Sequence, residues 1–354
     1  MDAAVEPLMK KDGIPGMAVG IVAGRRSYVF NYGLAAANPP EPVTRATLFE
    51  IGSVSKTFTA TLTTYAQVTG HLSLRDTTSR FLPSLKETPF GDVSLLNLGT
   101  HTPGGLPLQV PDGIQSDDQL MQYLRKWQAT CKPGTCRTYS NPGIGTLGLI
   151  TAISMHGSFD SLMEQFIFRP LSMTSTFLQV PDNRMPDYAQ GYTKNDRPIR
   201  MAPGELSEEA YGVRTTAADM LRFLDANMNL IRVNRTLQRA ITETHTGYFQ
   251  DGGMTQDLIW EQYPYPVPLD TLLAGNSPEM ALNATPVQAI MPPEKARNDV
   301  WLNKTGSTNG FGAYVAFVPS RRLGIVMLAN KNYPNQNRVA VAYSILQGVA
   351  GDAH

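Results

Sequence analysis

A serine and a lysine stand three positions apart at the start of an apolar stretch of this 354-residue chain, in Ser53-Val54-Ser55-Lys56. On a helix, residues i and i+3 share a face, so the amine of Lys56 can reach the hydroxyl of Ser53. A serine hydroxyl is a poor nucleophile near neutral pH unless a neighbouring base takes its proton. The pair predicts nucleophilic catalysis at Ser53, although the same spacing also occurs in capped helices with a solvated lysine.

A second group of chemically useful residues, Lys304-Thr305-Gly306, lies just before an apolar segment near the C-terminus. Lys304 offers a positive charge, Thr305 a hydroxyl donor, and Gly306 a position where substrate can approach the backbone. Together these groups are suited to binding a carboxylate.

A third group, Tyr139-Ser140-Asn141, lies in a polar segment that leads into an apolar helix. A phenol has an ordinary pKa near 10 and is a poor base at neutral pH. Ammonium groups from Lys56 and Lys304 would stabilise the phenolate and lower that pKa. The alternative is a tyrosine packed beneath a loop, which we would favour if either partner motif were missing.

Strand patterns at both ends of the chain indicate a sheet. Apolar runs at 17–22 and 28–30, and again at 314–318 and 323–328, flank short polar turns as in hairpins. Both faces of the last two strands are apolar, so helices should cover each face. A helical stripe over 339–349 supplies one such helix, and residues 2–12 can supply another.

The middle of the chain favours helices interrupted by Pro and Gly. After Ser53, apolar residues recur at helical spacing until Gly70 can end the helix. This helix is rich in threonine, a weak helix former, so burial between two structural regions must stabilise it. We expect an α/β (α+β) fold: an antiparallel sheet flanked by helices, from segments 1–60 and 290–354, and a mainly helical region, 61–289, with the active site at their interface.

Composition narrows the classes of partner. The chain has 42% hydrophobic residues and balances 30 basic against 30 acidic residues, so its formal net charge is zero. Nothing in that balance points to nucleic acid or an anionic membrane. No apolar run approaches the roughly 18 residues that a membrane span needs. We therefore expect a small-molecule partner. Nothing in the sequence suggests an obligate interface, so we also expect a monomer, although the sequence does not define the oligomeric state.

The cysteines and histidines bear on disulfide and metal chemistry. Cys131 and Cys136 bracket a Pro-Gly pair, and such a turn can bring the thiols close enough for a disulfide, although two free thiols remain the alternative. The five histidines are scattered without ligand spacing, so we assign no metal. A Gly-x-Gly-x-x-Gly match at 143–148 follows no apolar strand, so we expect no nucleotide and no other cofactor.

Taken together, the motifs resemble those of class C serine β-lactamases, the AmpC-type cephalosporinases, over nearly the whole chain. S-x-x-K with K-T-G is a signature of serine β-lactamases and penicillin-binding proteins. Further segments look like class C segments in the same order: Phe49-Glu50-Ile51-Gly52, Thr102-Pro103-Gly104-Gly105-Leu106-Pro107-Leu108-Gln109, Ala210-Tyr211-Gly212-Val213, 303–312 and 328–335.

The resemblance implies the serine β-lactamase/DD-peptidase fold and a role for each matched position. Ser53 would attack the lactam carbonyl, and the backbone N–H groups of Ser53 and Ser307 would hold the oxyanion. Lys56 and Tyr139 would move the protons, and which of them is the acylation base stays open. The implied substrate-binding residues, besides Lys304, are Gln109 and Asn141 for the acyl side-chain amide, Tyr211 for the side-chain pocket, and Thr305, Gly306 and Asn335, with Arg338 nearby, for the carboxylate.

Other readings share these motifs: a D-alanyl-D-alanine peptidase, a serine esterase of the same fold, or a penicillin receptor that is acylated without turnover. The class C resemblance favours hydrolysis of cephalosporins and penicillins through an acyl-enzyme. The start Met1-Asp2-Ala3-Ala4 lacks signal-peptide features. The sequence alone is compatible with a cytosolic protein or a mature form, and the resemblance implies a mature periplasmic enzyme. The substrate spectrum stays open.

Overall fold

The computed structural model describes residues 1–351, so residues 352–354, including His354, lie outside the described residues. The helices are α1 (Asp2–Asp12), α2 (Ser55–Val68), α3 (Leu95–Gly99), α4 (Asp117–Lys126), α5 (Asn141–Ser154), α6 (Phe159–Met163), α7 (Ser207–Tyr211), α8 (Ala217–Asn227), α9 (Arg235–Glu243), α10 (Leu269–Gly275), α11 (Pro278–Leu282) and α12 (Asn335–Gly351). Across residues 1–351, no helix has the length and apolar character that crossing a membrane requires.

The strands are β1 (Gly16–Ala23), β2 (Arg26–Ala37), β3 (Pro40–Pro42), β4 (Phe49–Glu50), β5 (Cys136–Arg137), β6 (Thr176–Phe177), β7 (Gly191–Tyr192), β8 (Pro198–Ile199), β9 (Arg214–Thr215), β10 (Gly247–Asp251), β11 (Met254–Gln256), β12 (Glu261–Pro264), β13 (Thr285–Pro286), β14 (Gln288–Glu294), β15 (Val300–Ser307), β16 (Gly312–Val318) and β17 (Leu323–Ala329). Ten of them form one sheet in the order β14-β10-β11-β12-β15-β16-β17-β1-β2-β3.

This sheet is antiparallel and joins the two ends of the chain at its centre. Strand β17 pairs with β1 from Met17 opposite Ala329 to Ala23 opposite Leu323, and β16 pairs with β17 on the other side. The two hairpins predicted from the sequence, β1–β2 and β16–β17, are both present. The predicted antiparallel sheet of an α/β fold is therefore confirmed.

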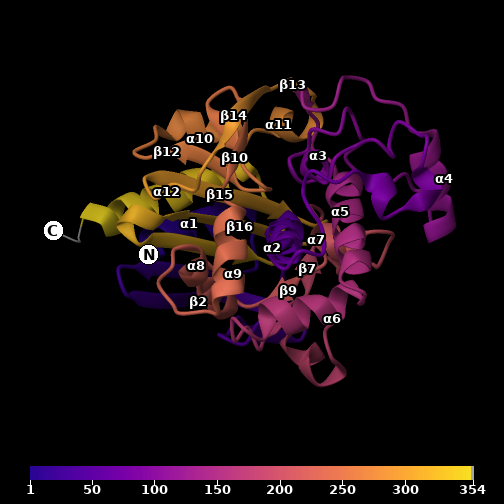
Figure 1. Ribbon diagram of the computed structural model, residues 1–354. Helices are drawn as coiled ribbons and strands as arrows, with labels where there is room; N and C mark the ends of the chain where they lie inside the picture. The colour runs from indigo at the N-terminus through magenta and orange to yellow at the C-terminus, as the bar shows by residue number, and fades with distance from the viewer. Residues whose placement is uncertain (352–354) are drawn as a thin grey trace.

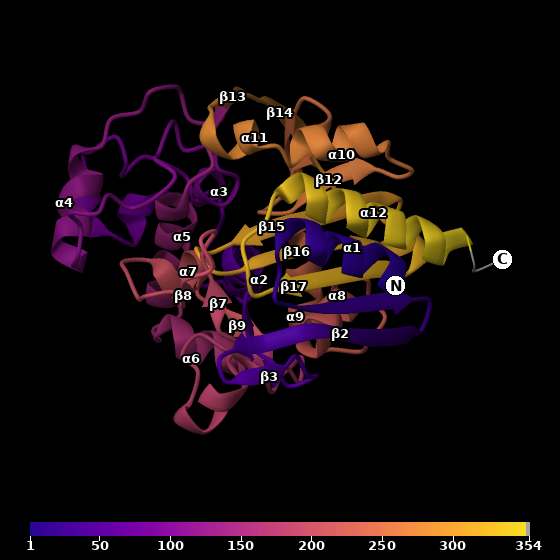
Figure 2. The same cartoon turned by 180° about the vertical axis from the view of Figure 1, so that it is seen from behind.

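Helices cover both faces of the sheet, as the doubly apolar strands require. In Figure 1, α8 and α9 lie in front of the sheet, and Figure 2 shows α1 and α12 on the opposite side. Helix α8 contacts β1 and β17, α12 contacts β16 and β17, and α1 packs on α12. The helical segments α3 to α6 lie to one side of the sheet in both views.

Helix α2 runs through the interior between these parts. Eleven of its fourteen residues are buried, and its threonines find acceptors there. Thr63 hydrogen-bonds to Thr151 of α5 at 2.8 Å, and Thr64 donates to the carbonyl of Ala240 in α9 at 2.9 Å. Burial with satisfied hydroxyls thus offsets the weak helix propensity of threonine.

The region predicted to be mainly helical, 61–289, also contributes strands to the large sheet. Strands β10, β11 and β12 belong to the large sheet, although the sequence analysis placed 247–264 in the helical region. Their pattern was obscured because polar residues such as Gln256, Glu261 and Gln262 are buried there beside Trp260. A short strand with buried polar groups does not show the apolar alternation that predicts a half-buried strand.

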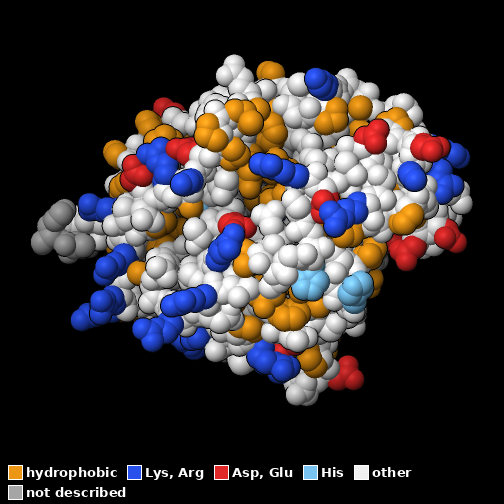
Figure 3. Space-filling view, viewed as in Figure 1, with side chains coloured by type: hydrophobic (Ala, Val, Ile, Leu, Met, Phe, Trp, Pro, Cys, Tyr) orange, Lys and Arg blue, Asp and Glu red, His pale blue; other side chains and the backbone are white. Residues whose placement is uncertain are grey.

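Charges are unevenly spread over the face drawn in Figure 3. Basic side chains gather at the lower left of that view, and acidic ones lie mainly at the right and upper left. Arg25 and Arg26 of the β1–β2 turn, and Arg321 and Arg322 of the β16–β17 turn, are all exposed. A formal net charge of zero therefore coexists with a locally basic end of the sheet.

Candidate active site

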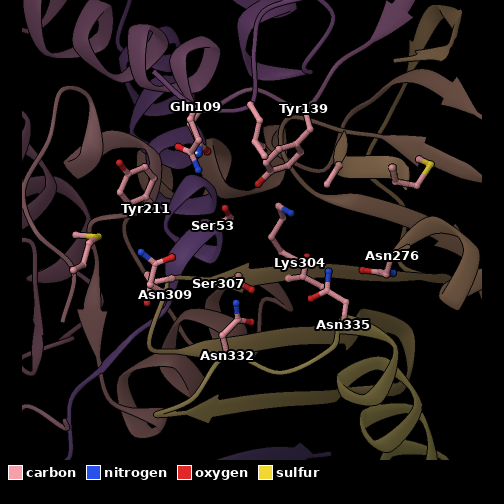
Figure 4. Close-up of a pocket in the computed structure, with 18 of the residues that line it drawn as sticks. Ser53, Gln109, Tyr139, Tyr211, Asn276, Lys304, Ser307, Asn309, Asn332 and Asn335 are labelled. Atoms are coloured by element: carbon pink, nitrogen blue, oxygen red, sulfur yellow. The ribbon is translucent and has the colours of Figure 1, made fainter. Parts of the chain in front are cut away.

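A cleft of about 590 Å³ opens between the end of the sheet and the helical segments. Figure 4 shows its labelled side chains converging on Ser53 from several elements. Its lining includes Ser53, Gln109, Tyr139, Asn141, Tyr211, Lys304, Thr305, Gly306, Ser307 and Asn335. The structure thus brings together ten of the predicted site residues that lie far apart in sequence.

Ser53 lies in a turn of 3-10 helix, Gly52–Val54, that leads directly into α2. Lys56 Nζ lies 2.9 Å from Ser53 Oγ and donates to the carbonyl of Ala210 at 2.7 Å. The pKa of Lys56 is lowered to about 8, mainly by burial, with the charge of Lys304 adding to the lowering and Tyr139 opposing it. Close to neutral pH, an amine with this pKa can exchange protons with the hydroxyl beside it.

The end of β15 lies directly against the turn that carries Ser53. Gly52 has φ of 51°, in the left-handed region that favours glycine. A Cβ atom at Gly52 would lie 2.5 Å from the backbone nitrogen of Ser307, and one at Gly306 would lie 2.0 Å from the carbonyl of Ile51. Two glycines therefore let the backbone of Ser307 approach the nucleophile, as an oxyanion hole requires.

Tyr139 is 7% exposed and lies between two ammonium groups. Lys304 Nζ lies 5.1 Å and Lys56 Nζ 5.2 Å from the centre of its ring. Burial would raise the pKa of Tyr139, but Lys304, Lys56 and a hydrogen bond with Ser53 together hold it below its ordinary value. The phenol is thus prepared to lose its proton more readily than a free tyrosine.

Lys304 is itself held by a buried carboxylate. Its Nζ lies 3.2 Å from Glu261 Oε1, and both side chains are almost fully buried. Burial lowers the pKa of Lys304, but Glu261 and Tyr139 together outweigh that effect and raise it. Arg137 lies 3.8 Å from the same carboxylate oxygen. Lys304 therefore remains cationic beside Tyr139.

The opposite wall of the cleft carries amide groups. Asn141 donates from Nδ2 to Gln109 Oε1 at 2.8 Å, which fixes the two side chains relative to one another. The Oδ1 atom of Asn141 is buried without a hydrogen-bond partner among the described residues. Tyr211, at the end of α7, also lines this part of the cleft. These groups can bind an amide on a ligand.

Arg338 is the one predicted substrate-binding residue that does not line the cleft. Its guanidinium is buried beneath β15 and donates to the carbonyl of Gly306 at 2.6 Å and to Ser307 Oγ at 3.1 Å. Burial lowers its pKa to about 10. Arg338 therefore supports the strand that forms the cleft wall, and Asn335 is the residue of α12 that faces the cleft.

The predicted pairing of Cys131 with Cys136 is present as a disulfide, with the two Cα atoms 6.4 Å apart. The bridge closes the turn through Gly134, whose N–H donates to the carbonyl of Thr102. It lies three residues before Tyr139. The link thus constrains the segment that delivers the phenol to the site.

Several residues of this site have no motif in the sequence and were not predicted from it. Glu261 and Arg137 surround Lys304, while Met201 and Asn276 line the cleft. The one available signal was a charged residue directly after Trp260 in a short strand, since a buried carboxylate needs a cationic partner. That signal does not name the partner.

The comparisons with known proteins agree with this geometry. Residues 1–350 match the family model described as beta-lactamase. A curated beta-lactamase of Pseudomonas fluorescens is 48% identical over 349 residues, covering 99% of this chain and 98% of that protein.

Solved structures extend the similarity. One described as D-alanine carboxypeptidase AmpC from Burkholderia cenocepacia superposes with a TM-score of 0.95 at 56% identity, covering 98% of this chain and 97% of the other. One described as a class C beta-lactamase in complex with cefoxitin has a TM-score of 0.96 at 50% identity, with the same coverages.

Proposed function

The chain belongs to the β-lactamase family, and from this we propose that it is a periplasmic cephalosporinase that hydrolyses cephalosporins and penicillins through an acyl-enzyme on Ser53. The observation that carries the proposal is the contact of Ser53 with Lys56 at 2.9 Å, beside a tyrosine of lowered pKa. Its solved relatives include class C β-lactamases, and one of them is described with bound cefoxitin.

In acylation, Ser53 Oγ forms a bond to the lactam carbonyl carbon, and its proton passes to Lys56 or Tyr139. The carbonyl oxygen becomes an oxyanion, which the backbone N–H groups of Ser53 and Ser307 stabilise. Collapse of this intermediate breaks the carbon–nitrogen bond, and the leaving nitrogen receives a proton from the same pair. The product is an ester on Ser53 with the ring opened.

Deacylation reverses the roles of the same groups. Water adds to the ester carbonyl and gives its proton to Tyr139 or Lys56, and the returning proton releases Ser53 Oγ. Lys304 stabilises negative charge on Tyr139 at this stage, since it lies 5.1 Å from the ring centre. Two proton-transfer groups in contact with one hydroxyl support turnover rather than permanent acylation.

Substrate recognition follows from the cleft walls. We assign the acyl side-chain amide to Gln109 and Asn141, and the carboxylate to Thr305 and Asn335, with Lys304 as the nearby cation. The hydrogen bond between Asn141 and Gln109 supports the first assignment, because it presents a fixed pair of amides to the ligand.

The test is steady-state hydrolysis of a chromogenic cephalosporin and a penicillin, with intact-protein mass spectrometry. We expect sustained turnover and a transient adduct, and Ser53→Ala should abolish both. A stoichiometric burst that stops, with a stable adduct, would make the protein a penicillin receptor instead. Ser55→Ala is the matched control, because Ser55 bonds to Val213 and does not line the cleft.

A second activity, D-alanyl-D-alanine carboxypeptidase, has specific support. Two solved structures at 56% and 49% identity are described with this activity, one of them together with β-lactamase. Release of D-alanine from a D-Ala-D-Ala peptide measures it. We expect a much lower kcat/KM than for the cephalosporin, and the reverse order would make the peptidase the main activity.

A further inference from the structure

His101 contacts three consecutive residues around the site tyrosine. Its carbonyl accepts the N–H of Thr138 at 2.8 Å, and its Nδ1 accepts the N–H of Ser140 at 3.3 Å. Between these two bonds its ring packs on the ring of Tyr139, with centroids 4.3 Å apart and planes inclined by 38°. One residue therefore holds both neighbours of Tyr139 and the face of its ring.

The hydrogen bond to Ser140 defines the state of the imidazole. Because Nδ1 accepts, it carries no proton, and a neutral ring must then be protonated on Nε2. Nε2 is buried and has no partner among the described residues, and the whole residue is only 1% exposed. The backbone of His101 has φ of 59°, a conformation that histidine and asparagine adopt more readily than most residues.

The charged groups around the ring favour this neutral state. Burial, followed by the positive charges of Arg137, Lys56 and Lys304, holds the pKa of His101 well below its ordinary value. Glu261, the carboxylate beside two of these cations, is already paired with Lys304 and Arg137. An imidazolium would place a further cation there and would lose the acceptor for Ser140.

We propose that His101 is a positioning residue, whose neutral imidazole fixes Tyr139 between Lys56 and Lys304 by accepting the Ser140 N–H. His101 does not line the cleft, so it acts through the tyrosine and not on the substrate. Ser140 also caps α5 through its side chain, which accepts the N–H of Gly143 at 3.0 Å. The contacts of His101 with residues 138–140, here called the clamp, therefore join this segment to the start of the buried helix α5.

Loss of the clamp has a defined consequence for the proposed reaction, on whose use of Tyr139 this inference rests. A tyrosine free to move away from the two lysines loses the stabilisation of its phenolate, so its pKa returns toward the ordinary value. The acid limb of the kcat/KM profile should then shift to higher pH. Small displacements of a catalytic group also lower kcat, by about 10- to 100-fold.

Three substitutions separate the contributions of His101. His101→Phe keeps an aromatic ring but removes the acceptor, while His101→Gly removes both and relaxes the backbone. His101→Asn keeps an acceptor close to the position of Nδ1 and tolerates the left-handed backbone. We expect Phe and Gly to lower kcat and to shift the acid limb upward, with little change in KM, and Asn to remain near wild type.

The matched control is His245→Asn, at another buried histidine that bonds to Asn227 and lies outside the cleft. It should leave the pH profile unchanged. Equal losses of kcat in His101→Asn and His101→Phe would overturn the proposal. A loss of kcat in His101→Phe with none in His101→Gly would also overturn it, because it would report backbone strain and not the missing acceptor.

A second readout does not depend on turnover. Ultraviolet titration of tyrosinate, with Tyr139→Phe as the reference to subtract, gives the pKa of Tyr139 directly. An upward shift in His101→Phe but not in His101→Asn supports the clamp, and no shift overturns it. If the wild-type protein hydrolyses no β-lactam, the proposed function fails, whereas this titration still decides whether His101 positions Tyr139.

Discussion

At the scale of single residues, the site depends on charges that the protein places in its interior. Lys56, Tyr139 and Lys304 are each almost fully buried, and each has a pKa moved from its ordinary value. Burial contributes most to each balance, and the charges of the three groups then act on one another, so the three groups titrate as a coupled unit. Changing one charge should therefore alter the proton affinity of the others.

Lys304→Met tests this coupling. Lys304 is the charge that most strongly lowers the pKa of Tyr139, so its removal should raise that pKa and move the acid limb of kcat/KM to higher pH. We expect kcat to fall by about 100-fold, as for loss of one stabilising group at the reacting centre. The pH profile of cephalosporin hydrolysis measures both effects.

The control is the double variant Lys304→Met/Glu261→Gln. Glu261 raises the pKa of Tyr139, so its neutralisation should move the limb part of the way back. It also removes the carboxylate that the single variant leaves without its lysine partner, beside Arg137 and Asn303. An acid limb at the same pH in all three proteins would contradict the coupling.

Asp257 gives a second residue-scale prediction, about stability. It is 0% exposed, and neither carboxylate oxygen has a hydrogen-bond partner among the described residues. Burial, with a contribution from Glu294, raises the pKa of Asp257 well above its ordinary value. The folded protein thus keeps a proton that the unfolded chain releases near pH 4, so stability falls as pH rises from there toward the folded pKa.

Asp257→Asn cannot lose that proton. We expect its melting temperature to fall less than that of the wild type between about pH 5 and about pH 8. Asp299→Asn, at a fully exposed aspartate, should leave the wild-type slope in this range. If the melting temperatures of Asp257→Asn and wild type fall in parallel as the pH rises, Asp257 is ionised in the folded protein.

At the scale of elements, one buried carboxylate connects three segments that shape the cleft. Glu50 in β4 accepts from Tyr188 Oη at 2.5 Å, from the N–H of Met201 at 2.7 Å and from Thr308 Oγ1 at 2.5 Å. Met201 and Thr308 line the cleft on different segments. The position of β4 is thus transmitted to two segments that line the cleft.

Glu50→Gln should weaken this connection, because the amide offers one acceptor where the carboxylate offers two. We expect a loss of about 1 to 3 kcal/mol in the free energy of unfolding, and a lower kcat/KM for cephalosporins with bulky acyl groups. Denaturant unfolding and steady-state kinetics measure these. Thr308→Val removes one of the three bonds and should cost less; equal costs would mean that Glu50 holds Thr308 alone.

The elements also show what sequence alone can predict. Hairpins β1–β2 and β16–β17 were predictable because continuous apolar runs flank polar turns. Strand β12 was not, because Glu261 is stable inside the sheet through Lys304, Arg137 and Asn303, partners distant in sequence. Ser53, Lys56 and Lys304 were found from motif spacing, whereas His101 has no motif and acts through contacts that exist only in the fold.

At the scale of the whole molecule, the helical segments and the sheet share one core cluster. Phe58 of α2 stacks on Phe223 of α8 with centroids 4.1 Å apart, and it meets the edge of Phe168 at 5.6 Å. Phe223 belongs to a helix on the sheet, and Phe168 to the helical segments. The two parts are therefore expected to unfold together.

Phe58→Ala should lower the free energy of unfolding by about 3 to 5 kcal/mol, the range for a buried phenylalanine, while keeping a single transition. Circular dichroism follows the secondary structure of the whole chain, whereas tryptophan fluorescence follows the local packing around Trp127, beside the helical segments, and Trp301, on the sheet. Separate midpoints for the two probes would contradict a shared core. Tyr28→Ala, at a side chain 43% exposed, should change little.

The pairing of β1 with β17 has a consequence for biosynthesis. The strand that begins at Gly16 finds its central partner only when residues 323–329 have been made, and Lys304 and Ser307 also come late. A growing chain therefore cannot complete the central sheet or the nucleophile's surroundings before synthesis is nearly finished. Such non-local pairing slows folding. For most of its synthesis the nascent chain therefore lacks its catalytic centre, and it can still pass as an extended chain through a narrow channel.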